Sequence, residues 1–377
     1  MITDPALPPL TIRTVRPIGV EVPMTYALGT SQARITRAPL LLINLETEEG
    51  ITGRAYLFCY LGAAAPAMAA MLDEIGHMVA GDPVVPAQLW GKLAQRFMLI
   101  GVQGVVRMAM AGLDVAAWDA LAIAAGVPLA TFLGAKSVGG KSVGGKPQPV
   151  RAYNSCGLGL MAPAEVADES EKLLARGFRA VKLRLGYPTL KEDLTAVHAV
   201  RRRIGDDVDL MVDYNQALSV PDALERGRAL DAENIYWIEE PIRHDDYAGC
   251  ASLAQALTTP IQIGENFSLP VAMETALKAN AADYVMPDLE RIGGVTGWRQ
   301  AAVLAAEHRI KMSSHLFPEV SAHLLAATPT GHFLEYMDWA DALVQEPLRI
   351  VDGHALIPER PGNGLEWDQA AVARFRM

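Results

Sequence analysis

The chain contains three short apolar runs that each end in a carboxylate: VDLMVD (residues 208–213), IYWIE (235–239) and IQIGE (261–265). Their length and their content of β-branched and aromatic residues predict buried strands. Each run is followed by a stretch with helical periodicity, and the three terminal carboxylates are equally spaced along the chain. A regular alternation of buried strand and helix predicts a parallel sheet with helices packed against it.

The same alternation continues on both sides of these runs. We predict strands at 150–154, 179–185, 208–213, 235–239, 261–265, 283–286, 310–312 and 332–334. Eight strands separated by helices favour a (β/α) barrel over an open sheet. A doubly wound sheet is the alternative, but no G-x-G-x-x-G follows any of these strands to form a dinucleotide site.

The N-terminal part has a different pattern. Residues 11–22 and 40–58 alternate polar and apolar side chains, and we interpret the polar segment GTSQARITRAP (29–39) between them as a long loop. These features predict a β-meander. From about 64 to 133 the chain is alanine-rich with helical periodicity, which completes an α+β domain.

These patterns divide the chain into four parts. A flexible connection is indicated where KSVGG occurs twice in a glycine-rich segment that ends in Pro-Gln-Pro. The expected parts are an α+β domain (1–135), this connection (136–149), the barrel (150–345) and a C-terminal segment that returns to the first domain (346–377).

The composition narrows the class of protein. The chain has 377 residues, 51% of them apolar, which is enough for a large core. A formal net charge of -10 and a pI near 5.3 disfavour a phosphate-backbone partner, so we expect no nucleic-acid binding. The N-terminus lacks a leader pattern, and no run approaches the about 18 apolar residues of a membrane span. With three cysteines and no CxxC motif, we expect a soluble protein of the reducing cytoplasm.

Polar residues end each predicted barrel strand. They are Lys182, Arg184, Asp213, Glu239, Glu265, Asp288, His315 and Glu335. In a barrel the carboxyl ends of all strands meet at one mouth, which is where barrel enzymes have their active sites. The alternation of strand and helix therefore predicts that these side chains converge.

Three of these residues suggest a metal site. Asp213, Glu239 and Glu265 come from successive strands, and three converging carboxylates repel one another unless a cation lies among them. Ligands that are all oxygen select a hard ion such as Mg²⁺. A single carboxylate of this kind would be read as a surface or salt-bridged group, so the prediction depends on all three.

The other rim residues suggest proton transfer. A carboxylate at Asp288 can fix the tautomer of His315 and raise its basicity, as a general base requires, although a histidine hydrogen-bonded to a backbone carbonyl is the alternative. Lys182 and Arg184 point to the same face of a strand. We interpret Lys182 as a clamp on a substrate carboxylate and a protonated Glu335 as a hydrogen-bond donor to the developing enolate.

Several segments resemble one known family. FRAVKLRLGYP, MVDYNQ, WIEEP, IGEN, MPD followed by RIGGVTGW, and MSSHLFPEVSAHLLAATPT are similar to segments of the mandelate racemase subgroup of the enolase superfamily. The resemblance implies a capping domain over a modified TIM barrel, (β/α)₇β, with Mg²⁺ on the three carboxylates. It also implies the Asp288–His315 dyad, Glu335 as donor, a small hydroxy-acid substrate and a homo-oligomer, often an octamer.

The chain departs from the family at Arg184, where the racemase motif Lys-x-Lys has a lysine base. Arginine has a pKa above about 12 and is a poor proton acceptor, so two-base racemisation is in doubt. A guanidinium suits a second carboxylate or a hydroxyl of the substrate instead. Substrate contacts are expected at Asn215, Tyr56, Ser155, Met24 and Tyr26.

The segment matching the family's lid, residues 24–37, carries Tyr26, Gln32, Arg34 and Arg37 and is more polar than the racemase lid. A substrate more polar than mandelate is indicated, unless these arginines face solvent. We therefore expect dehydration of a sugar acid or hydroxy diacid, with His315 as general base and acid. A mandelate-type racemase or epimerase is the alternative, and a metal-binding protein without turnover is a third.

Overall fold

The N-terminal part of the chain is built on a three-stranded antiparallel sheet. The computed structural model describes residues 5–30, 34–135 and 147–377. Strands β1 (Ile12–Gly29), β2 (Arg34–Thr47) and β3 (Thr52–Phe58) pair in sequence order, so the predicted β-meander is confirmed. The long loop predicted at 29–39 is wrong. Leu28 pairs with Ile35, and the backbone ladder extends β1 and β2 into this polar segment because ladder hydrogen bonds need no apolar side chains.

Helices follow this sheet in the chain, and the first and third of them pack against its strands. They are α1 (Ala65–Val79), α2 (Pro86–Arg96), α3 (Gly104–Ala124) and α4 (Leu129–Phe132), with a 3-10 turn η1 (Gly62–Ala64) before α1. Helix α3 lies against β3, and a Cβ at Gly53 would collide with the carbonyl of Ala116. Asp119 of α3 accepts hydrogen bonds from the backbone N–H groups of Arg54 and Asn363. This helix therefore joins the sheet to the C-terminal segment.

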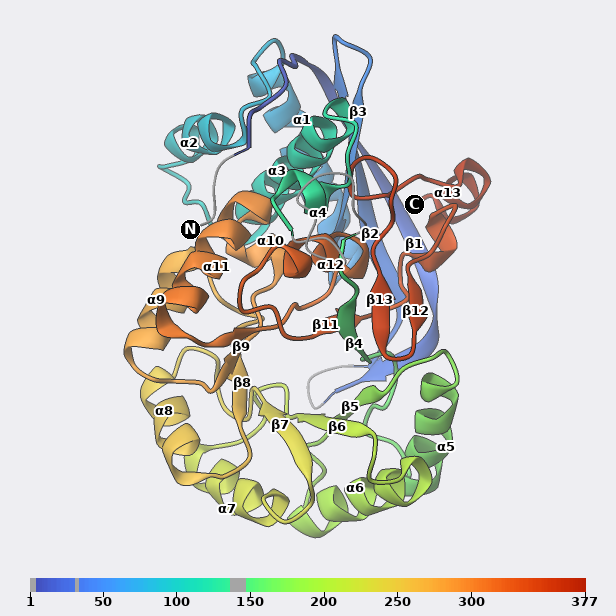
Figure 1. Ribbon diagram of the computed structural model, residues 1–377, viewed down its shortest axis with the longest axis vertical. Helices are drawn as coiled ribbons and strands as arrows, with labels where there is room; N and C mark the ends of the chain where they lie inside the picture. Colours follow the sequence, from blue (N-terminus) through green and yellow to red (C-terminus); the bar gives the residue numbers. More distant parts are fainter. Residues whose placement is uncertain (1–4, 31–33, 136–146) are drawn as a thin grey trace.

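Eight parallel strands form the second part of the structure (Figure 1). They are β4 (Val150–Asn154), β5 (Ala180–Arg184), β6 (Asp209–Asp213), β7 (Ile235–Glu239), β8 (Ile261–Ile263), β9 (Tyr284–Val285), β10 (Lys311–Met312) and β11 (Leu334–Tyr336). Neighbours from β4 to β10 pair in order, and β11 pairs with β4. Backbone bonds from Met312 N to Thr330 O and from His332 N to Met312 O close the barrel.

Helices connect the successive barrel strands. They are α5 (Pro163–Leu174), α6 (Leu190–Ile204), α7 (Val220–Leu230), α8 (Tyr247–Ala256), α9 (Leu269–Lys278), α10 (Leu289–Ile292), α11 (Gly294–His308) and α12 (Pro318–Ala326). The predicted (β/α)₇β barrel with an α+β capping domain is confirmed. The last strand was predicted at 332–334 and is observed at Leu334–Tyr336. Residues 332 and 333 precede it and bond to the backbone of Met312 and Ser314. Glu335 consequently lies within β11 and not after it.

The C-terminal segment runs back to the capping domain. After η2 (Asp341–Leu343), the hairpin of β12 (Arg349–Val351) and β13 (His354–Leu356) adds to β4 in antiparallel orientation. Helix α13 (Gln369–Phe375) follows, and Met377 N donates to Gly19 O of β1 over 3.0 Å. Of the predicted connection 136–149, residues 136–146 lie outside the described residues.

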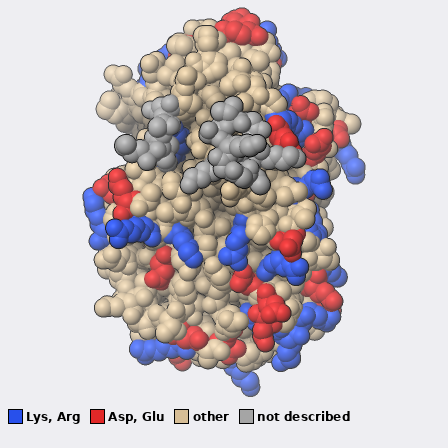
Figure 2. Space-filling view, in the orientation of Figure 1, with Lys and Arg blue, Asp and Glu red and all other residues tan. Residues whose placement is uncertain are grey.

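Aromatic side chains fill the barrel interior below its mouth. Tyr153, Trp237 and Phe333 form a buried cluster with Ala180 and Met211. Because this cluster occupies the interior, the polar strand ends are accessible only from the carboxyl end, where the capping domain lies. On the face seen in Figure 2, charged side chains of both signs are interspersed over the barrel. No helix in the described part of the chain is long and apolar enough to cross a membrane.

Candidate active site

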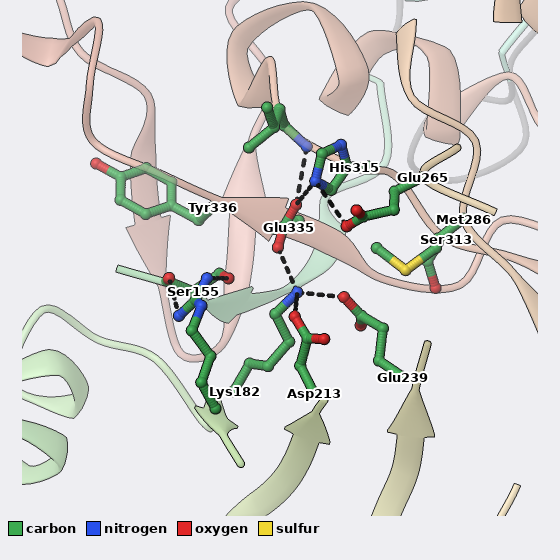
Figure 3. Close-up of polar contacts among 12 residues, drawn as sticks. Ser155, Lys182, Asp213, Glu239, Glu265, Met286, Ser313, His315, Glu335 and Tyr336 are labelled. Atoms are coloured by element: carbon green, nitrogen blue, oxygen red, sulfur yellow. Dashed lines mark hydrogen bonds and ion pairs between the residues drawn. The ribbon is translucent and has the colours of Figure 1, made fainter. Parts of the chain in front are cut away.

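The carboxyl ends of the barrel strands bring the predicted rim residues together (Figure 3). They are Lys182 on β5, Asp213 at the end of β6, Glu239 at the end of β7, Glu265 after β8, Asp288 after β9, His315 after β10 and Glu335 on β11. All of these side chains are buried except Glu265, which is 15% exposed. A dense group of ionisable side chains thus lies at one end of the barrel.

Lys182 lies at the centre of this group. Its Nζ is 2.8 Å from Glu335 Oε1 and 3.3 Å from Asp213 Oδ2, and it also pairs with Glu239. Burial lowers the pKa of Lys182, but these three carboxylates outweigh that effect and raise its pKa above the ordinary value. The ammonium is therefore charged. It faces the barrel interior, as we predicted, and its partners are carboxylates of the chain itself.

His315 and Asp288 form a close pair. His315 Nδ1 is 2.6 Å from Asp288 Oδ2, and His315 Nε2 is 3.2 Å from Glu265 Oε2. The other oxygen of Asp288 accepts the N–H of Glu290 over 2.8 Å, which holds Asp288 as the N-cap of α10. Burial lowers the pKa of His315, but Glu265, Glu335 and the bond to Asp288 raise it well above the ordinary value. With its Nδ1 side bonded to Asp288, the histidine presents Nε2 to the mouth.

Glu335 accepts hydrogen bonds in this arrangement. Its Oε2 accepts the backbone N–H of Leu316 over 2.9 Å, and its Oε1 contacts Lys182. Burial raises the pKa of Glu335, but Lys182 and His315 outweigh it and lower the pKa to about 2. Glu335 therefore accepts from Leu316 and Lys182 here, and its role as a hydrogen-bond donor to the developing enolate stays a prediction.

Two of the three candidate metal ligands are oriented by their neighbours in the chain. Asp213 Oδ1 accepts the backbone N–H of Asn215 over 2.7 Å, and its Oδ2 accepts the Asn215 side-chain amide over 3.1 Å. Glu265 Oε1 accepts from Asn266 Nδ2 over 3.1 Å. Asn215, predicted to contact substrate, thus also orients a carboxylate.

The donor chemistry at the mouth fits a hard divalent cation. Burial raises the pKa of Glu239 to about 8, with Lys182 opposing and Asp213 and Glu335 adding to the rise. Asp213, Glu239 and Glu335 all pair with the single ammonium of Lys182, so carboxylates outnumber cations around it. Oxygen ligands of this kind suit Mg²⁺. Within residues 5–30, 34–135 and 147–377, no three Asp, Glu, His or Cys side chains are grouped closely enough to hold a metal ion, and the Lys182 ammonium pairs with Asp213 and Glu239.

Arg184 lies beside the mouth and is bonded to the loop after β4. It donates to Ser155 O over 3.1 Å, to Gly157 O over 2.7 Å and to Ser155 Oγ over 3.2 Å. The side chain is almost fully buried. Two predicted site residues, Arg184 and Ser155, are thus joined to each other, and the guanidinium supports the backbone of this loop.

The predicted capping-domain contacts have different surroundings. Tyr56 is buried, donates to Glu319 Oε2 over 2.7 Å and packs on Phe317, so it joins the two domains. Met24 and Tyr26 are half-buried on β1, and Tyr26 lies against Gly157, where an added Cβ would be 3.0 Å from the Tyr26 Cβ.

The arginines of the predicted polar lid lie at the surface. Arg37 pairs with Glu21 over 2.5 Å, and Arg34 is exposed, so the described part of the lid gives little support for arginines directed at a substrate. Gln32 lies outside the described residues. The alternative, in which these arginines face solvent, fits the structure better.

Two buried glutamates escaped the sequence analysis. Glu290 accepts the backbone N–H of Phe58, and Glu319 accepts the hydroxyl of Tyr56, so both connect β3 to segments that follow the dyad. Burial raises the pKa of Glu319 to about 7. Each follows closely on Asp288 or His315 in the chain, which was the only available signal.

The chain matches two family profiles that together cover most of its length. Residues 10–134 match the mandelate racemase / muconate lactonizing enzyme N-terminal domain, and residues 165–371 match the enolase C-terminal domain-like family. L-talarate/galactarate dehydratase of Salmonella typhimurium is 31% identical over 356 residues, which cover 94% of this chain and 87% of the relative.

Solved structures agree with this assignment. An enolase from the alpha proteobacterium BAL199 with bound Mg has a TM-score of 0.93 at 42% identity, covering 98% of this chain and 100% of its own. An enolase from Bradyrhizobium complexed with magnesium and mandelic acid has a TM-score of 0.90 at 37% identity, covering 99% and 100%. The chain therefore belongs to the mandelate racemase / muconate lactonizing enzyme family of the enolase superfamily.

Proposed function

We propose that this chain is a Mg²⁺-dependent dehydratase of a sugar acid or a related hydroxy diacid. The observation that carries the proposal is the Asp288–His315 pair, in which Nδ1 is bonded to Asp288 and Nε2 lies 3.2 Å from Glu265, a candidate metal ligand, at the mouth. The similarity to L-talarate/galactarate dehydratase supports the substrate class, and the Mg²⁺ in related structures supports the cofactor.

The proposed roles at the mouth follow from the donor set. Asp213, Glu239 and Glu265 would hold Mg²⁺, and the bound ion would supply a positive charge beside the substrate carboxylate. Lys182 donates to the same carboxylate, because its buried ammonium already lies among anionic oxygens. A small acid with one carboxylate at this point would place its α-carbon near His315.

His315 performs both proton transfers. Its Nε2 takes the α-proton, and Asp288 accepts the Nδ1–H and stabilises the imidazolium that forms. The same Nε2–H then protonates the β-hydroxyl, the carbon–oxygen bond breaks and water leaves. The resulting enol takes up a proton at the β-carbon and becomes a 2-keto acid.

Arg184 favours dehydration over two-base racemisation. It stands where the related racemase motif has a lysine base, and its guanidinium is bonded to Ser155 and Gly157. A guanidinium is in effect always protonated, so it cannot accept a proton from the opposite face of the substrate. Racemisation of a mandelate-like acid remains a second candidate because of the similarity to the Bradyrhizobium enolase that binds mandelic acid.

One experiment separates these functions. Purified protein with Mg²⁺ is incubated in D₂O with a panel of aldonates, aldarates and both mandelate enantiomers, and proton NMR follows each reaction. We expect a 2-keto acid from at least one sugar acid and none from the His315→Asn variant. Inverted, deuterated mandelate without any keto acid would establish the racemase instead. A homo-oligomer remains a prediction, tested by light scattering after size exclusion.

A further inference from the structure

A chain of polar side chains crosses the barrel interior beneath the mouth. It begins at the half-buried Tyr236 near the start of β7, passes through His332, Ser313 and Gln262, and ends at Glu239. The function proposed above uses only the last of these residues. The other four lie within the aromatic interior of the barrel or beside it, where a polar group without a partner is costly.

Each link in the chain is a contact between two side chains. Tyr236 Oη is 2.9 Å from His332 Nε2, and His332 Nδ1 is 3.4 Å from Ser313 Oγ. Ser313 Oγ is 3.2 Å from Gln262 Oε1, and Gln262 Nε2 is 3.3 Å from Glu239 Oε2. Ser313, Gln262 and Glu239 are fully buried, so solvent does not compete for these bonds.

The donors and acceptors permit only one direction along the chain. As a metal ligand Glu239 is ionised and only accepts, so Gln262 presents its amide N–H to it. The Gln262 carbonyl then needs a donor, which is the Ser313 hydroxyl. Ser313 in turn accepts from His332 Nδ1–H, and His332 Nε2 accepts the Tyr236 hydroxyl. Every proton therefore points toward Glu239.

This direction requires a neutral histidine. Burial lowers the pKa of His332 to about 3, and the nearby Lys311 and Arg151 add to the effect. The imidazole is thus neutral near pH 7, and its contacts with Ser313 and Tyr236 place its single proton on Nδ1. The alternative tautomer would turn the Ser313 hydroxyl toward His332 and leave the Gln262 carbonyl without a donor.

Glu239 is held differently from the other two carboxylates. Its Oε2 accepts both Gln262 Nε2 and, over 3.0 Å, Trp237 Nε1. Its Oε1 remains on the mouth side, where Figure 3 shows it joined to Lys182. Neighbours in sequence orient Asp213 and Glu265, whereas Glu239 is held both by its sequence neighbour Trp237 and, through Gln262, by side chains from other barrel strands.

We propose that Gln262, Ser313 and His332 are positioning residues that fix Glu239 Oε2 and so direct Oε1 to the divalent cation. This inference rests on the proposed function, because it takes Glu239 to be a metal ligand. The residues touch neither substrate nor metal, and they act only through Glu239. Partners of metal ligands typically contribute about 10–100-fold to metal affinity.

Mg²⁺ affinity of the metal-free protein tests the proposal. Isothermal titration with MgCl₂ is carried out on EDTA-treated wild type, Gln262→Met, Ser313→Ala, Ser170→Ala and Glu239→Gln. Ser170 is a matched control. It is as buried as Ser313, but it donates to Ala167 O on α5 and is not part of the series of hydrogen bonds that ends at Glu239. We expect Gln262→Met to weaken Mg²⁺ binding by about tenfold or more, Ser313→Ala by less, and Ser170→Ala not at all.

Thermal unfolding of the metal-free variants separates positioning from stability. If Gln262→Met and Ser313→Ala lower the melting temperature but leave Mg²⁺ affinity unchanged, while Glu239→Gln loses binding, the positioning role is wrong and the metal site stands. If Glu239→Gln binds Mg²⁺ like the wild type, the proposed ligand set itself is wrong and this inference falls with it. Ser313→Ala removes only one oxygen and should fold. Its Mg²⁺ affinity therefore tests the proposal even if Gln262→Met does not fold.

Discussion

Tyr56 of β3 donates its hydroxyl to Glu319 of α12 over 2.7 Å, and this bond joins the capping domain to the segment that follows His315. Both side chains are buried, and the second oxygen of Glu319 has no partner among the described side chains and backbone. The contact is thus the only described hydrogen bond to this carboxyl. It ties the position of α12 to that of the capping sheet.

Tyr56→Phe removes this bond without removing the ring. We expect the free energy of unfolding in urea to fall by about 1–3 kcal/mol, because a buried carboxyl loses its donor. Substrate contact is the competing role for Tyr56. A variant with unchanged stability but a raised KM would contradict the interdomain role and favour substrate binding.

Glu319→Gln changes how stability depends on pH. Burial raises the folded-state pKa of Glu319 to about 7, above its unfolded value. The folded state therefore binds the extra proton between about pH 4.5 and 7, and wild-type stability falls as pH rises through that window. The variant has no such proton, so its stability relative to wild type should increase from pH 5 to pH 8, by at most about 3 kcal/mol. Denaturation at both pH values measures this difference, and a constant difference would contradict it.

His315→Asn removes the proposed acid and base. We expect kcat for keto-acid formation to fall by about 10²–10⁴, with little change in KM, since Lys182 and the carboxylates proposed to hold Mg²⁺ remain. Deuterium exchange at the α-carbon in D₂O should be lost in parallel. Retained exchange in this variant would point to another base.

Arg184→Met should destabilise the protein by about 1–3 kcal/mol, because Ser155 and Gly157 lose a buried donor. Arg203→Met is the matched control. Its side chain is 43% exposed and pairs with Glu171 over 2.9 Å at the surface, so we expect a change within about 0.5 kcal/mol. If urea denaturation gave the same loss of unfolding free energy for both variants, the hydrogen bonds of Arg184 would not stabilise the protein more than a surface ion pair does.

Much of the barrel and its rim could be predicted from sequence for one physical reason. A parallel barrel repeats strand and helix, so side chains that end successive strands must meet at one mouth. Strand 235–239 was predicted at its observed bounds, and Asp213 and Glu239 lie where the repeat implied. The predicted histidine–carboxylate pair has a distance of 2.6 Å.

What could not be predicted depends on contacts between distant segments. Residues 34–39 of the polar stretch lie in β2 because their backbone pairs with β1, and polar composition carries no signal of that. The chain from Tyr236 to Glu239 through His332 and Gln262 joins several barrel strands, and each residue alone looks like an ordinary core position. The ion pair between Lys182 and Glu335 could not be predicted either, since it depends on how two separate strands are placed.

The bond from Met377 to Gly19 has a consequence for biosynthesis. Strand β1 leaves the ribosome early, but the residues that bond to it, around α13, are translated only after the whole barrel. The barrel can therefore assemble on the ribosome while β1 still lacks its C-terminal neighbour. Strand β1 therefore gains its contacts with α13 only after the barrel has been synthesised.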